Sequence, residues 1–121
     1  MRKVCIGIHV HEEPEQLRAT LESVRRTTAS SVEVVLLPDG ADRRMKEALG
    51  AWSGLTLLGT EEPRGVAACF NRLAAYGDAD VVALLESGSR VSPHWLDILL
   101  AALDADPRHG LAGPSTNRAW N

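Results

Sequence analysis

A single carboxylate follows the apolar run at residues 81–85 and could take part in metal chemistry. Glu86 is followed by Ser87 and Gly88, so the segment has the layout of an acid-x-acid metal clamp with only its first acid. Carboxylates in such a clamp hold Mg²⁺ or Mn²⁺ against phosphate oxygens. Because Gly88 offers no ligand, we expect a divalent-cation site at Glu86 that is weakened. The alternative is that Glu86 only ends a strand at the surface.

A second carboxylate follows another apolar run, at residues 32–37. Asp39 can accept hydrogen bonds from a base or a sugar, and Gly40 lets the backbone turn sharply beside it. An Asp-Gly pair is also common in plain turns, which is the alternative interpretation. Its place at the end of a predicted strand favours a binding role.

Two histidines alternate along the first apolar run, Val4–Val10 and its continuation. His9 and His11 should face the same side, so both imidazoles can reach one ion, with Glu12 or Glu13 nearby. No third ligand stands at a spacing typical of a metal motif. We therefore expect both histidines to line a pocket or to be partly exposed, rather than to bind a metal.

Apolar runs alternate along the chain with segments of helical periodicity. Strands are predicted at residues 4–10, 32–37, 55–58 and 81–85, and helices at 14–26, 42–50, 65–76 and from 92 to about 106. Ser92 and Pro93 have the types expected for the N-cap and first residue of the last helix. This alternation predicts an α/β fold with an open, mainly parallel sheet flanked by helices. In such sheets ligands bind beyond the carboxyl ends of the strands, where the polar residues described above should converge.

Length and composition limit the classes of protein to consider. The chain has 121 residues, 45% hydrophobic and 24% charged, with a formal net charge of -3, which is too mild to favour nucleic acid. No run approaches the ~20 apolar residues of a membrane span. Two cysteines do not make a disulfide framework, so we expect a cytoplasmic location. Residues 1–121 should form a single domain, and the lack of a final element suggests a fragment of a longer domain.

Four segments occur in a distinctive order. They are residues 4–8 with the helix at 14–24, residues 34–40, residues 64–71, and residues 84–96. Together they resemble family 2 glycosyltransferases of the GT-A fold, and the resemblance covers nearly the whole chain. It implies a Rossmann-like domain that binds a nucleotide-diphosphate sugar. In the intact parent it further implies transfer of the sugar to a hydroxyl acceptor with inversion.

The resemblance also implies roles for individual residues. Asp39 matches the aspartate that holds the base or ribose, Gly65 and Asn71 match an Arg-Gly-x-Ala-x-Ala-x-Asn pattern, and residues 86–88 match Asp-x-Asp. Arg64 could meet the diphosphate as a two-pronged donor, or could be a solvated loop residue. The implied donor-binding set is His9, Val10, His11, Asp39, Gly40, Arg64, Gly65, Asn71, Glu86 and Ser87, with Glu86 as the metal ligand.

Two other classes of protein stay open. Gly88, the replaced family residues at 9–12 and the lack of a catalytic base favour a non-catalytic nucleotide-sugar-binding or assembly module; the resemblance places that base in the second half of the domain, so none of residues 1–121 is assigned to it. A signalling domain of the receiver type would want an aspartate after the third strand, where residues 59–61 read Gly-Thr-Glu. A sheet edge left open could also pair with another copy of the chain.

Overall fold

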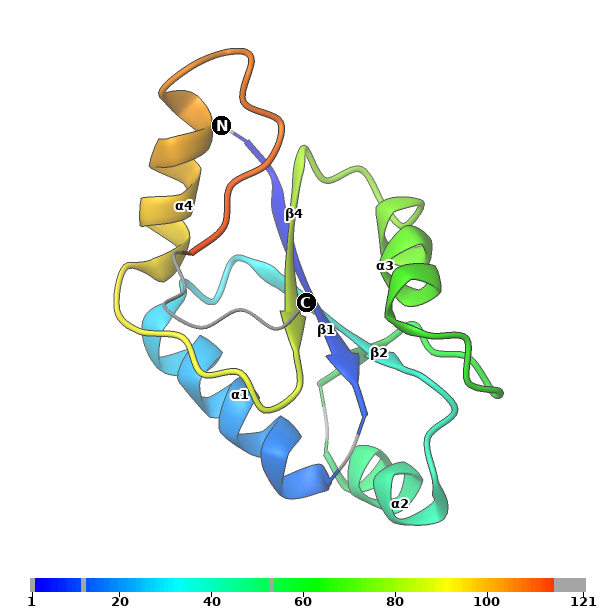
Figure 1. Cartoon of the computed structure of the whole chain (residues 1–121). Helices are drawn as coiled ribbons and strands as arrows, with labels where there is room; N and C mark the ends of the chain where they lie inside the picture. The colour runs from blue at the N-terminus through cyan, green and yellow to red at the C-terminus, as the bar shows by residue number, and fades with distance from the viewer. Residues whose placement is uncertain (1, 12, 53, 115–121) are drawn as a thin grey trace.

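The computed structural model describes residues 2–11, 13–52 and 54–114. These residues form a four-stranded parallel sheet, with strand order β3-β2-β1-β4, flanked by helices (Figure 1). The strands are β1 (Val4–Val10), β2 (Glu33–Pro38), β3 (Thr56–Leu57) and β4 (Val81–Glu86). The helices are α1 (Pro14–Thr27), α2 (Arg43–Ala51), α3 (Val66–Ala74) and α4 (Trp95–Asp104). The predicted fold class is confirmed.

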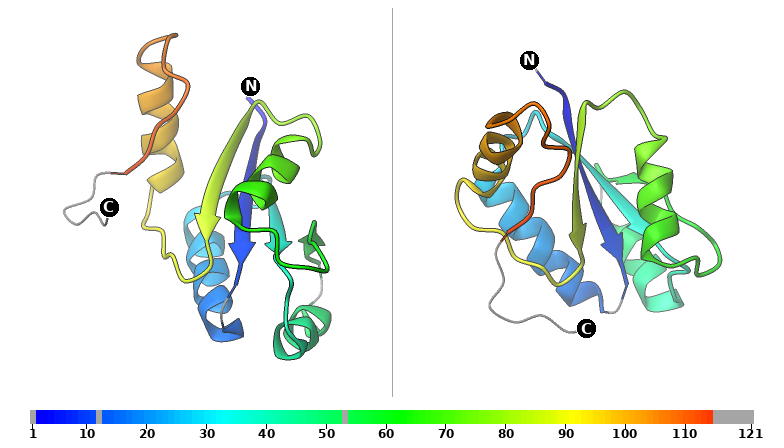
Figure 2. Two further views of the ribbon diagram at one scale, coloured as in Figure 1. Left: turned by 45° about the vertical axis from the view of Figure 1, so that its right-hand side comes forward. Right: turned by 45° about the horizontal axis from the view of Figure 1, so that its top comes forward.

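The sheet is covered on both faces by separate layers. Figure 2 shows α1 and α4 on one side of the sheet and α3 on the other. The larger core cluster joins α1, α2 and α4 to β1 and β2, and a smaller cluster joins α3 to the opposite face of the same strands. Burial of β1 and β2 on both faces explains why their sequences are almost continuously apolar.

Alternation along β1 decides which side chain reaches which layer. Ile6 and Ile8 enter the core beneath α1, whereas Cys5 enters the core beneath α3. Gly7 allows α3 to approach the strand closely, because a Cβ atom there would lie 2.1 Å from Leu73 Cδ2. His9 continues the Cys5 and Gly7 side of the strand, so it emerges at the end of β1 on the face that α3 covers.

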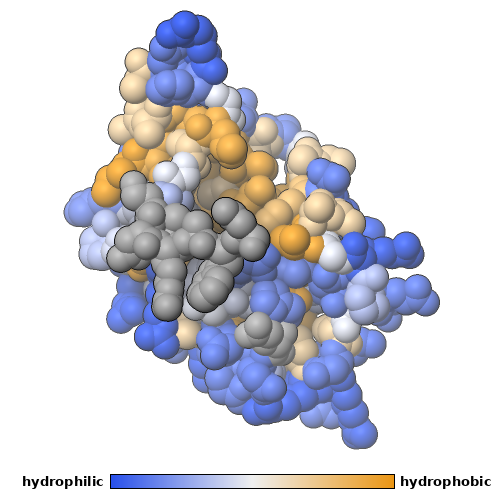
Figure 3. Space-filling view, viewed as in Figure 1, coloured by the Kyte–Doolittle hydropathy of each residue, from blue (hydrophilic) through white to orange (hydrophobic). Residues whose placement is uncertain are grey.

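β4 forms one edge of the sheet, and its two faces differ. Val82 and Leu84 are 36% and 44% exposed, although both are large and apolar. They lie on the α3 face of the sheet, beyond the part that α3 covers. Figure 3 shows hydrophobic residues gathered over α4 and the neighbouring parts of β4 and α3, while the surface over α1 and α2 is mainly hydrophilic. None of the described helices is both long and apolar enough to cross a bilayer.

The last helix begins later than its sequence predicts. α4 starts at Trp95, and His94 before it has a left-handed φ of 65°. Ser92 does not act as the N-cap; its carbonyl instead accepts from the Trp95 amide at 3.2 Å. The indole nitrogen of Trp95 donates to Thr28 Oγ1 at 3.0 Å, which ties the start of α4 to the end of α1. The left-handed backbone at His94 separates the Ser-Pro pair from the helix, so the local signal does not set the start of α4.

Candidate functional site

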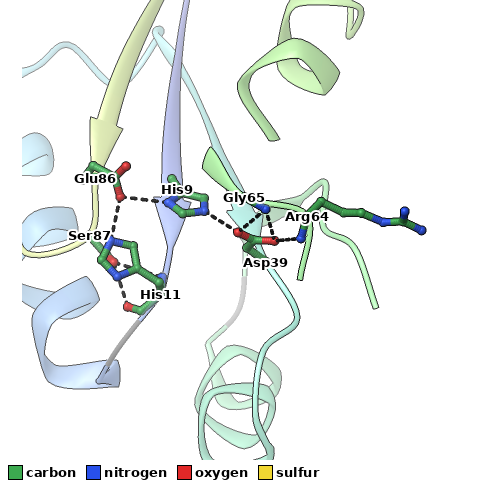
Figure 4. Close-up of polar contacts among 7 residues, drawn as sticks. All are labelled: His9, His11, Asp39, Arg64, Gly65, Glu86 and Ser87. Atoms are coloured by element: carbon green, nitrogen blue, oxygen red, sulfur yellow. Dashed lines mark hydrogen bonds and ion pairs between the residues drawn. The ribbon is translucent and has the colours of Figure 1, made fainter. Parts of the chain in front are cut away.

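Three strand ends place polar side chains at one edge of the sheet. His9 pairs with Glu86 in the register of β1 with β4 and with Leu37 in the register of β1 with β2. Asp39 directly follows β2, and its backbone forms an isolated parallel β-bridge with Thr60. The carboxyl ends of parallel strands therefore meet as expected, and Figure 4 shows the side chains that converge there.

His9 lies between the two carboxylates. Its Nδ1 is 2.8 Å from Glu86 Oε2, and its Nε2 is 2.8 Å from Asp39 Oδ2. Because carboxylates only accept, both ring nitrogens must donate, which describes an imidazolium. Burial opposes this charge and is the largest single influence, but the hydrogen bonds to Glu86 and Asp39 together outweigh it and raise the pKa of His9.

Asp39 is the anchor of this edge. Its side chain is only 8% exposed, and its carboxylate accepts from the backbone amides of Arg64 at 2.6 Å and Gly65 at 3.1 Å. The hydrogen bond from the Arg64 amide, followed by that from His9, lowers the pKa of Asp39 to about 2. In Figure 4 the guanidinium of Arg64 points away from Asp39, so it is the backbone that holds the loop to β2.

His11 completes the cluster from the far side of Glu86. Its Nε2 lies 2.6 Å from Glu86 Oε2, the same oxygen that His9 contacts. Ser87 Oγ donates to the His11 carbonyl at 2.8 Å and accepts from the His11 amide at 3.1 Å. Since Ser87 is buried, this pair of bonds fastens the end of β1 to the residue after β4.

Two glycines set the backbone around the cluster. Gly40 has a φ of 63°, and a Cβ atom there would lie 2.6 Å from the backbone nitrogen of Pro63, so the chain before Arg64 packs directly on the turn. Gly88 has a φ of 98°, which side-chain-bearing residues rarely adopt. Residue 88, where an acid-x-acid clamp would have its second acid, therefore also needs glycine for its backbone conformation.

The predicted donor-site residues do not all meet. His9, His11, Asp39, Glu86 and Ser87 come together, joined by the backbone of Arg64 and Gly65 and flanked by Gly40. The side chain of Val10 is 1% exposed and faces the core beneath α1, so only its backbone can face a ligand. Asn71 is exposed on α3, outside the cluster. Glu12 lies outside the described residues.

The sequence did not reveal that Glu86 joins the two histidines. Alternation placed His9 and His11 together, but the third group follows 75 residues after His11 and comes close only through the pairing of β1 with β4. Glu13, the neighbouring acid, instead forms an ion pair with Arg44. Phe70 of α3 adds an apolar wall, with its ring edge-on to His9 at 6.1 Å between centroids. A hollow of about 500 Å³ lies at the opposite, amino ends of the strands, away from all these groups.

Comparison with known proteins places this geometry in a family. Residues 5–120 match the model of glycosyl transferase family 2. A glucosyl-dolichyl phosphate glucuronosyltransferase of Haloferax volcanii is 26% identical over 120 residues, which are 97% of this chain and 38% of that protein. The chain thus spans well under half the length of this curated relative.

Solved structures share the fold. A mannosyltransferase from Pyrobaculum calidifontis, in complex with GDP-Man and Mn²⁺, matches with a TM-score of 0.75 and 19% identity, covering 88% of this chain and 33% of that one. Glucosyl-3-phosphoglycerate synthase from Mycobacterium tuberculosis, in complex with UDP, matches with a TM-score of 0.67 and 18% identity, covering 84% and 40%. Because residues 5–120 of its 121 residues match the family model, the chain belongs to glycosyl transferase family 2.

Proposed function

We propose that this chain is the donor-binding part of a glycosyltransferase and takes a nucleotide-diphosphate sugar at the carboxyl ends of β1, β2 and β4. The observation that carries the proposal is Asp39, buried after β2 and bonded to the amides of Arg64 and Gly65. These bonds fix the loop at Arg64 and Gly65 beside the Asp39 carboxylate. The carboxylate suits a base or ribose, and the loop lies close enough to meet a diphosphate. The similar structures that contain GDP-Man or UDP support the same ligand class.

Each group would have a defined part in holding the donor. The Asp39 carboxylate accepts from the base or ribose once His9 or an amide gives way, and the Gly65 backbone lets the donor approach closely. The exposed Arg64 guanidinium is not engaged by the Asp39 anchor and can turn toward the diphosphate as a two-pronged donor. Val10 contributes its backbone only, and Asn71 would approach from α3.

The residues at Glu86 do not suit a hard cation such as Mg²⁺ or Mn²⁺. Such an ion takes several oxygen ligands. Glu86 Oε2 lies between two imidazole nitrogens, Ser87 Oγ is bonded to the His11 backbone, and Gly88 has no side chain. This donor set supports a weakened hard-cation site, and the binding of the nucleotide should not depend on that ion.

The parent protein would transfer the sugar to a hydroxyl acceptor by direct displacement with inversion, with its catalytic base contributed by the second half of the domain. We place it in the cytoplasm, a proposal supported by Cys5 and Cys69, which are buried and unpaired. The competing function is a non-catalytic nucleotide-sugar-binding or assembly module. It is favoured by Gly88 and by the hydrogen bonds that already occupy Asp39.

Thermal denaturation with a panel of nucleoside diphosphates in EDTA tests the proposal. We expect at least one to stabilise the chain, by about 2.7 kcal/mol at a concentration of 100 times its Kd. Asp39→Asn should remove this stabilisation, whereas Asp78→Asn, an exposed change at the amino end of β4, should keep it. If no nucleotide raises the melting temperature of the wild-type chain, the donor-binding proposal fails and the assembly role is favoured.

A further inference from the structure

Three potential metal ligands of mixed chemistry meet at the end of β1. The ligand atoms of His9, His11 and Glu86 all lie within 4.8 Å of one another. Glu86 Oε2 is 2.8 Å from His9 Nδ1 and 2.6 Å from His11 Nε2. The rings of the two histidines lie 5.1 Å apart between centroids and are tilted by 41°. His9 at the end of β1 and His11 just after it therefore converge on one carboxylate oxygen.

Two imidazoles and one glutamate form a donor set that zinc sites use. Zn²⁺ binds His nitrogen at about 2.0–2.1 Å and carboxylate oxygen at about 2.0–2.2 Å, and open zinc sites hold three such ligands with a vacant fourth position. Tetrahedral ligation at these lengths places ligand atoms about 3.4 Å apart. An ion would replace the protons on His9 Nδ1 and His11 Nε2. The distances from these nitrogens to Glu86 Oε2, now 2.8 and 2.6 Å, would then have to increase by less than about 1 Å, to about 3.4 Å.

The surroundings hold each ligand in place. His9 Nε2, the nitrogen that faces away from Glu86, is bonded to Asp39 Oδ2 at 2.8 Å. A carboxylate behind a ligating histidine fixes its orientation and raises its basicity. Asp39 is in turn held by two backbone amides, and Ser87 holds the backbone of His11. Glu86 and His11 are 42% and 37% exposed, which leaves a way in for an ion and an open position on it.

We propose that His9, His11 and Glu86 form a three-ligand site for a zinc-class divalent cation, with Asp39 as the positioning carboxylate behind His9. Nitrogen donors favour Zn²⁺ over Mn²⁺ and Mg²⁺. An ion held by these three residues would keep a position for a further ligand, which the donor diphosphate could take at this edge of the sheet. That last step rests on the proposed function, whereas the binding of the ion itself does not.

A second group of ligands competes for His9. His9, Asp39 and Cys69 also lie within 4.8 Å of one another. Cys69 is 1% exposed and the Asp39 side chain 8%, and Asp39 already accepts two backbone amides. An ion there would have no open route and would displace the bonds that anchor the loop. The half-exposed group around Glu86 is therefore the site.

Calorimetry of the metal-free chain with Zn²⁺, Mn²⁺ and Mg²⁺, without nucleotide, tests the inference. We expect one Zn²⁺ per chain, bound more tightly than Mn²⁺, and Mg²⁺ weakest. His11→Ala and Glu86→Gln should each weaken Zn²⁺ binding by more than about 100-fold, and Asp39→Asn by about 10–100-fold. His109→Ala, which removes an exposed histidine after α4, is the control and should bind as the wild type does.

Cobalt identifies the ligands independently of affinity. Co²⁺ in the wild-type chain should show visible absorption without a thiolate charge-transfer band, and Cys69→Ser should leave the spectrum unchanged. Equal Zn²⁺ affinity of the His11, Glu86 and His109 variants, tighter binding of Mn²⁺ than of Zn²⁺, or a thiolate band would overturn the site. Nucleotide binding is measured in EDTA and metal binding without nucleotide, so each experiment can fail while the other succeeds. A failure of the donor-binding proposal can therefore be distinguished from a failure of the metal-site proposal.

Discussion

At the scale of single residues, the charge on His9 depends on two opposing effects. Burial disfavours the imidazolium, while Glu86 and Asp39 on either side favour it and His11 stands next to Glu86. The net effect raises the pKa of His9. Its interactions therefore stabilise the fold fully below the ordinary imidazole pKa of about 6.5, and this stabilisation is lost as the pH rises through the higher folded-state value.

This behaviour predicts the pH dependence of stability. In EDTA, the free energy of unfolding of the wild-type chain should fall relative to that of His9→Gln as the pH rises above about 6.5. Urea unfolding of both chains at several pH values measures the difference. The comparison of the two chains isolates the contribution of residue 9 and of its interactions with Glu86 and Asp39. Parallel pH profiles for the two chains would contradict the assignment of the charge to His9.

At the scale of elements, α3 lies against β1 because residue 7 has no side chain. A Cβ atom at Gly7 would collide with Leu73, which is fully buried. Gly7→Ala should cost about 1–3 kcal/mol by overpacking, and Leu73→Ala about 2–5 kcal/mol by leaving a cavity. The double variant should lose less than the sum, since the new methyl group enters the space that Leu73 leaves.

Urea unfolding of the two single variants and the double variant measures this coupling. If the loss of stability in the double variant equals the sum of the two single losses, residues 7 and 73 are not coupled. That result would contradict the close packing of Leu73 on Gly7. Gly50→Ala is a suitable control, because a Cβ atom there would meet nothing within 4 Å.

The sequence predicts elements better than it predicts their ends and contacts. Periodicity located the strands and helices of the described residues. The local Ser-Pro signal failed at the start of α4, which begins only after the left-handed His94. Only two residues of β3 pair as a strand. On α3, Cys69 and Leu73 are buried, while Val66 is 38% exposed.

The candidate site shows the same limit. The convergence of residues 9–11, 39 and 86 follows from parallel strands, and so it could be predicted. That Glu86 shares one oxygen between His9 and His11 depends on the register of β1 with β4, which no local spacing encodes. The backbone bonds from Arg64 to Asp39 could not be predicted either, because they depend on how the loop folds over Gly40.

At the scale of the whole molecule, β4 is an edge strand, and its side chains on the α3 face of the sheet are apolar and exposed. Val82 and Leu84 are exposed, as is Val66 of α3, and β4 is hydrogen-bonded to β1 alone among the described strands. Exposed apolar edge strands favour pairing with another chain. We therefore expect the chain to associate with itself as its concentration rises.

Light scattering over a range of concentrations measures this association. Leu84→Lys should lower the average mass toward that of a single chain, because a charge on an edge strand opposes pairing. Leu57→Lys changes an exposed leucine on the opposite edge strand and should have a smaller effect if β4 is the contact. Equal effects of the two substitutions, or none, would exclude β4 as the surface that associates.

The backbone at Gly88 limits what a substitution at this position can restore. A substitution there to aspartate would restore the acid-x-acid layout on paper, but it would place a side chain at a φ of 98°. The amide of Gly88 also donates to Thr20 of α1 at 2.8 Å, so the loop cannot relax without losing that bond. A Gly88→Asp substitution therefore supplies a second carboxylate only at the cost of backbone strain or of the bond to Thr20. An acid at residue 88 would thus carry a backbone cost that the proposed ligands His9 and His11, neither of which has a positive φ, do not carry.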